Sequence, residues 1–161
     1  MSSFDRRTLL TGLVLLAGCG FQPAYGPGGR GKGMRGRIDV AAPADEEGFS
    51  LVRRLEDRLG RGEAAEYRLE AGIFLSEEAL GFLPNGSISR YNVQGRVDWR
   101  LIRLADDSLA LSGSERSFTS YSATSTTVAT IVAQRDARRR LMVSLADRIA
   151  ADLLARFPTE G

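Results

Sequence analysis

Hydrophobic and polar residues alternate most regularly between Ser89 and Arg103. The apolar residues on one side of this stretch are Tyr91, Val93, Val97, Trp99 and Leu101. The residues between them are polar: Arg90, Asn92, Gln94, Arg96, Asp98 and Arg100. Because successive side chains of a strand point to opposite faces of a sheet, this pattern predicts a strand with one buried and one exposed face.

Two similar stretches flank this strand along the chain. In the preceding one, residues 67–75, the apolar positions are Tyr67, Leu69, Ala71, Ile73 and Leu75. In the following one, Leu109 to Tyr121, serine and threonine are frequent. Pro84-Asn85-Gly86 and Asp106-Asp107 separate the three stretches and favour tight turns. A shorter strand is predicted over residues 35–41.

Two segments have the spacing of amphipathic helices. Asp45 is a suitable N-cap for the first, which ends at Gly60 and whose apolar stripe contains Phe49, Val52, Leu55 and Leu59. The second has apolar residues four positions apart: Ala133, Ala137, Leu141, Leu145, Ile149 and Leu153, widened by Met142 and Ala146. We expect Arg135 near the start of this helix and Pro158 at its end.

The predicted order is strand, helix, three strands, helix. Two helices with apolar stripes are expected to cover one face of the sheet, which gives an α+β fold. The architecture is then a two-layer sandwich of a four-stranded, mostly antiparallel sheet with both helices on one face. The other sheet face is expected to be polar and uncovered. No second linker follows residue 34, so residues 35–158 are expected to form one domain.

The first residues of the chain have the pattern of an export signal. Arg6 and Arg7 precede ten mostly apolar residues, too few to span a bilayer, and small residues follow directly before Cys19. Leu16-Ala17-Gly18-Cys19 resembles a bacterial lipobox. We therefore expect residues 1–18 to be a lipoprotein signal peptide, Cys19 to be acylated, and residues 19–34 to form a flexible tether. The paired arginines also resemble a twin-arginine signal, which leaves the export route open.

Composition argues against most enzymatic and metal chemistry. The 161-residue chain has no histidine, and Cys19 is its only cysteine. Adjacent acids such as Glu46-Glu47 and Glu77-Glu78 are expected to be solvated, and the many serines have no accompanying base. Gly26–Gly31 fits G-x-G-x-x-G but follows no strand. The net charge of +2 means that any basic character is local. We expect no enzyme, no metal, no cofactor and no nucleic-acid partner.

Several segments together resemble the LptE family of lipopolysaccharide-assembly lipoproteins in its α-proteobacterial form. The residues that carry the resemblance are Cys19–Gly26, Leu51–Leu55, Ser89–Asn92, Ser120-Tyr121, Arg135–Ala137 and Leu145–Ile149. The resemblance implies a non-catalytic lipoprotein, held by its lipid in the outer membrane, that plugs the LptD β-barrel from the periplasmic side. It also implies a role in delivering lipopolysaccharide to the outer leaflet. Gly20, in place of an aspartate after the cysteine, agrees with outer-membrane sorting.

Arginines are the candidate contacts for lipopolysaccharide, because its phosphates or uronic acids match the guanidinium fork. Arg90, Arg96 and Arg100 share the polar face of the central strand, and Arg135 belongs to the final helix. Solvated surface arginines or barrel contacts are the simpler interpretation of all four. Two other functions remain open: an auxiliary subunit of an ABC lipid transporter, and a lipid-anchored hydrolase using serine or aspartate.

Overall fold

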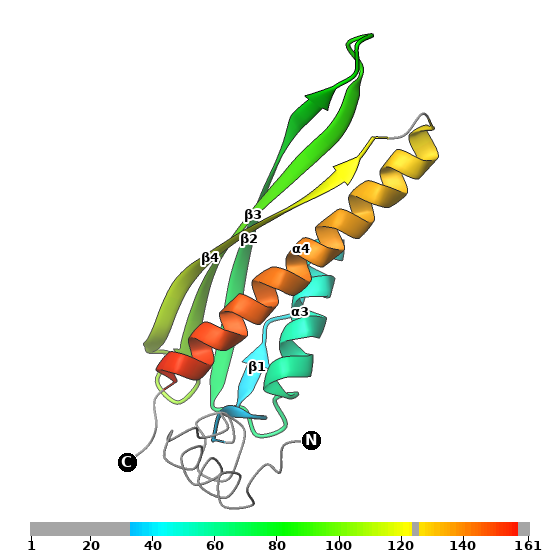
Figure 1. Cartoon of the computed structure of the whole chain (residues 1–161). Coiled ribbons are helices and arrows are strands. Elements are labelled where there is room, and N and C mark those ends of the chain that lie inside the picture. The colour runs from blue at the N-terminus through cyan, green and yellow to red at the C-terminus, as the bar shows by residue number, and fades with distance from the viewer. Residues whose placement is uncertain (1–32, 124–125, 158–161) are drawn as a thin grey trace, which may run out of the picture.

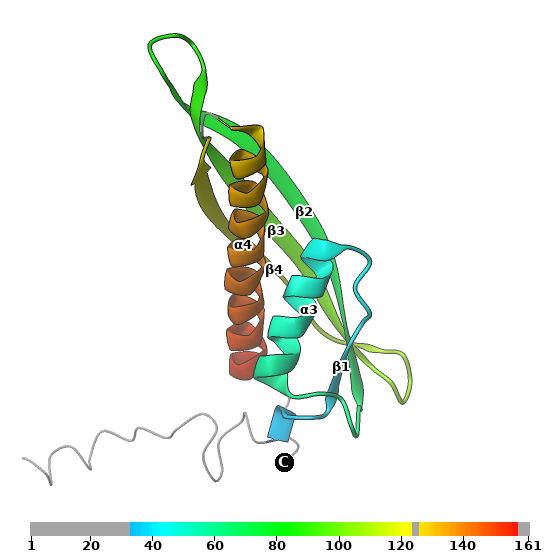
Figure 2. The ribbon, with the colours of Figure 1, turned by 90° about the vertical axis from the view of Figure 1, so that its right-hand side faces the viewer.

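The computed structural model describes residues 33–123 and 126–157. Their order is β1 (Ile38–Val40), α3 (Glu46–Leu59), β2 (Tyr67–Phe82), β3 (Ile88–Arg103), β4 (Leu109–Ser122) and α4 (Thr127–Arg156). Both helices lie on the same face of one sheet, as Figures 1 and 2 show from two directions. This confirms the predicted α+β architecture and its element order. The predicted signal peptide, Cys19 and most of the predicted tether lie outside the described residues.

The four strands follow one another across the sheet in chain order. β1 pairs with β2 in parallel, and β2–β3 and β3–β4 are antiparallel. Strand β2 continues to Phe82, seven residues beyond the predicted stretch, so the β2–β3 hairpin projects past the first turn of α4 (Figures 1 and 2). Both predicted turns are present: Gly86 has a φ of 79° at the first and Asp107 a φ of 54° at the second.

Helix α3 is delimited as its capping residues predict. The Asp45 carboxylate accepts a hydrogen bond from the Gly48 amide at 2.7 Å, and Gly60 ends the helix with a φ of 80°. The predicted apolar stripe was partly wrong, because the Phe49 side chain is 58% exposed whereas Leu51 is buried with Leu55 and Leu59. Leu51 lies on the side of the helix that α4 and the sheet cover.

Helix α4 is longer than its apolar pattern indicates. It begins at Thr127, so Arg135 lies in its third turn rather than at its start, which corrects the sequence-based placement. Its first turns carry apolar residues that solvent reaches, namely Val128, Ile131 and Val132. From Ala137 onward the predicted face is buried against the sheet and α3, with Leu141, Leu145, Ile149 and Leu153 all at most 1% exposed.

The inner face of the sheet supplies the other half of the core. Val93, Val97, Trp99 and Leu101 of β3 are buried, which confirms the predicted alternation. Gly113 of β4 lies opposite Trp99, and a Cβ atom there would come within 2.6 Å of the indole. The first strand is shorter than predicted, and Met34, which precedes it, is completely buried. The buried apolar residues therefore form one cluster, which includes Met34 near the start of the described residues and Phe157 at their end.

Candidate functional site: a groove on the outer face of the sheet

The outer face of the sheet, which neither helix covers, has two exposed phenylalanines among its polar residues. Phe74 of β2 is 52% exposed and Phe118 of β4 is 74% exposed. The register places Phe74 opposite Arg96 and Phe118 opposite Gln94, so both rings share the face of the predicted arginines. The prediction of a purely polar outer face was therefore wrong. Phe74 is an even number of residues from Arg68 and Glu70, so the alternation in the sequence already indicated that it shares their outer face.

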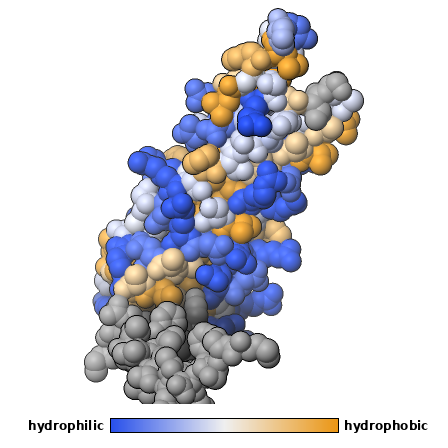
Figure 3. All heavy atoms as spheres, viewed as in Figure 1, coloured by the Kyte–Doolittle hydropathy of each residue, from blue (hydrophilic) through white to orange (hydrophobic). Residues whose placement is uncertain are grey.

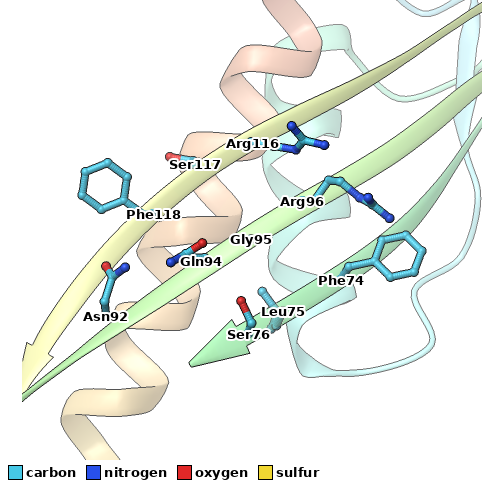
Figure 4. A pocket seen from close by; sticks show the side chains of 10 residues that line it. All are labelled: Phe74, Leu75, Ser76, Asn92, Gln94, Gly95, Arg96, Arg116, Ser117 and Phe118. Atoms are coloured by element: carbon cyan, nitrogen blue, oxygen red, sulfur yellow. The ribbon is translucent and has the colours of Figure 1, made fainter. Parts of the chain in front are cut away.

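A groove of about 630 Å³ crosses strands β2, β3 and β4 on this face. In Figure 4 the strands lie in front of α4, and the polar and aromatic side chains project from them. The side chains that line the groove on the outer face are Phe74, Ser76, Asn92, Gln94, Arg96, Arg116 and Phe118. This lining contains two cations and no acid, so the groove favours an anionic group.

Arg96 is held in place at one side of the groove. Its guanidinium carbon lies 4.5 Å from the centroid of the Phe74 ring, a cation–π contact visible in Figure 4. Its Nη2 atom is 3.2 Å from the Asp98 carboxylate, which also accepts a 2.7 Å hydrogen bond from Ser114. The Nε atom is buried and has no hydrogen-bond partner among the described residues. The guanidinium is therefore fixed at the side of the groove by Phe74 and Asp98.

The four predicted arginines do not form one site. Arg96 and Arg100 share the outer face of β3, but Arg100 donates to Glu70 at 3.1 Å. Arg90, on the same strand near the hairpin, lines a separate hollow with Asp136 and Arg140 of α4. Arg135 lines a third hollow, beside Glu46 and Glu47 at the start of α3. Of the four, Arg96 alone lines the groove. The second arginine of the groove is Arg116, which sequence reasoning missed because the register of β4 is not visible in the sequence.

On the inner face, two acids that were expected to be solvated converge on one arginine. Glu47 of α3 and Glu77 of β2 both accept hydrogen bonds from Arg138 of α4, at 3.1 and 3.4 Å. Tyr121 and Gln134 also donate to Glu77. These two acids are therefore ion-paired within the fold, although Glu77 is also exposed to solvent. The network joins β2, β4 and both helices where the apolar core ends.

The electrostatics of this network favour a structural role. Burial by itself would raise the pKa of Glu77, but three hydrogen bonds and the charge of Arg138 outweigh it and hold that pKa below its usual value. Burial and the adjacent Glu77 carboxylate raise the pKa of the Tyr121 hydroxyl well above its usual value. Glu77 is therefore ionised and Tyr121 protonated at neutral pH. A paired-acid hydrolase needs a carboxyl that keeps its proton there, which Glu77 does not.

We expect the Glu77→Gln variant to lose about 1–2 kcal/mol of unfolding free energy at pH 7, because the charge-assisted hydrogen bonds are weakened. A carboxylate whose pKa is lowered on folding stabilises above the unfolded pKa, and this contribution is lost as the pH falls through the folded value. The difference from wild type should therefore shrink below about pH 4.3. Urea unfolding over a pH series measures it, with Glu78→Gln on the outer face as control. A difference of the same size at pH 3 contradicts this account.

No three or more histidine, cysteine, aspartate or glutamate side chains in residues 33–123 and 126–157 are grouped so that they could hold a metal ion. Neither helix in that part of the chain is long and apolar enough to cross a membrane.

One comparison with known proteins identifies a family, and a second finds solved structures of similar fold. The family model described as "LptE: Lipopolysaccharide-assembly" matches residues 36–153. A candidate lipoprotein from Caulobacter crescentus has a similar crystal structure, with a TM-score of 0.62 and 25% identity over 78% of this chain and 93% of that one. Among curated proteins, none matches the sequence significantly.

Two further solved structures share the fold at 16% identity. The rare lipoprotein B from Shewanella oneidensis has a TM-score of 0.56 and covers 73% of this chain and 92% of its own. The minor lipoprotein from Acinetobacter baumannii has a TM-score of 0.52 and covers 73% of this chain and 88% of its own. The family match extends from β1 well into α4, and so it takes in the sheet, α3 and the outer-face groove. The chain belongs to the LptE family of lipopolysaccharide-assembly proteins.

Proposed function

We propose that this protein is an outer-membrane lipoprotein that plugs and assembles the LptD β-barrel and helps deliver lipopolysaccharide to the outer leaflet. The observation that carries the proposal is the family match over residues 36–153. The protein acts by binding and not by catalysis. In support, the two acids that converge from separate elements are both bound to Arg138.

The end of the molecule formed by the hairpin and the start of α4 suits a protein partner. Its exposed apolar residues are Leu80, Phe82 and Leu83 on the hairpin and Val128, Ile131 and Val132 on α4. Figure 3 shows apolar side chains over both elements. Exposed apolar patches of this kind are typical of protein interfaces. We assign this end to contact with the barrel.

The arginines of β3 are the proposed contacts for lipopolysaccharide. Arg96 and Arg100 lie on the sheet face that neither helix covers, and Arg90 lies nearer the hairpin, in the hollow beside α4. Arg135 is a proposed second contact, separated from these three because it lies on α4 beside α3. Phosphates or uronic acids of the lipid A and inner-core region would accept their hydrogen bonds.

Recovery of the barrel tests this function. When the full chain is purified in detergent from the outer membrane of its own host, we expect LptD to co-purify with it. Phe82→Ser should reduce the recovered LptD by about tenfold, because it removes an exposed apolar side chain from the proposed interface. Phe49→Ser, which changes a similarly exposed phenylalanine on α3, should leave recovery unchanged. Recovery of an inner-membrane ABC transporter in place of LptD would show that the protein is an auxiliary transporter subunit.

A further inference from the structure

Arg96 and Arg116 are an unusual pair on the outer face of the sheet. They lie directly opposite one another on β3 and β4. Like charges at directly opposed positions destabilise a sheet. Asp98 neutralises Arg96, but the exposed Arg116 has no hydrogen bond or ion pair within residues 33–123 and 126–157. The pair therefore has an excess positive charge that no described residue compensates.

The surroundings of this pair are partly apolar. Arg96 covers the Phe74 ring on one side, whereas Phe118, two residues beyond Arg116 on the same strand, has its ring free in solvent. Strand geometry places Phe118 roughly 7 Å from Arg116 along β4. Gln94 lies opposite Phe118, and Figure 4 shows its amide between the phenylalanine and Arg96. Along the groove, an anion site, polar donors and a free aromatic surface therefore follow one another.

We propose that this groove binds the anionic head of an amphiphile, with a phosphate or carboxylate between Arg96 and Arg116 and the adjoining apolar part along Phe118. Two guanidinium groups can donate several charge-assisted hydrogen bonds to either anion. The bound anion also balances the charge of Arg116, which no described residue compensates. This inference rests on the proposed function in that lipid A is such a molecule, and it assigns the head group to Arg116, which lies outside the four arginines considered first.

The test is titration calorimetry of the full chain in a neutral detergent at low salt, where screening is weakest. The probes are hexyl phosphate, hexanoate, inorganic phosphate and hexanol, each corrected with protein-free micelles. We expect hexyl phosphate or hexanoate to bind, inorganic phosphate to bind at least about tenfold more weakly, and hexanol not to bind. The tighter of the two alkyl anions identifies the chemistry of the natural head group.

Matched variants separate the groove from the general charge of the surface. Arg116→Gln should weaken binding of the alkyl anion by about tenfold or more, because the unpaired donor is lost. Arg68→Gln removes another exposed arginine from the outer face of β2, distant from the groove, and should change nothing. Phe118→Ser should abolish the advantage of hexyl phosphate over inorganic phosphate. Circular dichroism verifies that each variant is folded.

Three results would overturn the inference: no binding of either alkyl anion to the wild type, equal weakening by Arg116→Gln and Arg68→Gln, or hexanol binding as tightly as the anions. None of these results is expected to change the recovery of LptD, because LptD is proposed to contact the hairpin end of the molecule and not the groove. Conversely, failure to recover LptD with intact anion binding would reject the proposed function and leave the groove as a binding site.

Discussion

Trp99→Ala is expected to lower the free energy of unfolding by about 3–5 kcal/mol. The indole is 1% exposed, lies against Gly113, and has the Arg156 guanidinium 5.2 Å from its ring. Its removal leaves a cavity where β3 and β4 meet the end of α4. A domain of this size is stable by about 5–15 kcal/mol, so the variant should lose a large part of its stability. Urea unfolding followed by circular dichroism measures the change.

Phe118→Ala is the matched control for this substitution. Phe118 is an aromatic residue of the adjacent strand but faces solvent, so its truncation should change stability by no more than about 0.5 kcal/mol. Equal stability of the wild type and Trp99→Ala would mean that the contact between the indole and Gly113 does not form. Trp99→Phe should lose less than Trp99→Ala, because the ring partly fills the space and the buried indole N–H, which has no described partner, is absent.

The second large effect is expected at Cys19, where substitution by alanine should release the protein from the membrane or leave its signal peptide uncut. We propose that Cys19 bears three acyl chains after lipoprotein processing. Each buried methylene contributes ~0.8 kcal/mol, and a single chain holds a protein only reversibly, whereas several chains hold it stably. Membrane fractionation and mass spectrometry of the mature N-terminus measure the outcome. The result follows from lipid chemistry and requires no contact within the folded domain.

Gln22→Ala is the control, because it alters the same segment and leaves the thiol in place. This variant should remain with the membrane fraction. A wild-type protein whose N-terminus has no acyl group would remove the basis for membrane anchoring at Cys19. It would leave the family assignment unaffected, since the match begins at residue 36.

The sequence by itself determined most of the local structure. Strand β3 was predictable because its alternation runs through more than ten residues, and α3 because Asp45 and Gly60 define its ends. The sequence was insufficient where two residues of one helix were about equally suited to be buried. Phe49 and Leu51 lie near opposite borders of the same helical stripe, and only the position of α4 decided that Leu51 is buried.

The tertiary structure decided which residues meet. Arg116 lies opposite Arg96 only in the observed register of β4, and a shift by one residue would turn Arg116 and Phe118 toward the helices. Glu77 is next to Glu78 in the sequence, yet the first binds Arg138 across the inner face and the second lies on the outer face. Strand periodicity assigns residues to faces, but it does not say which residues of separate strands and helices are neighbours. That depends on register and on helix placement, which long-range packing fixes.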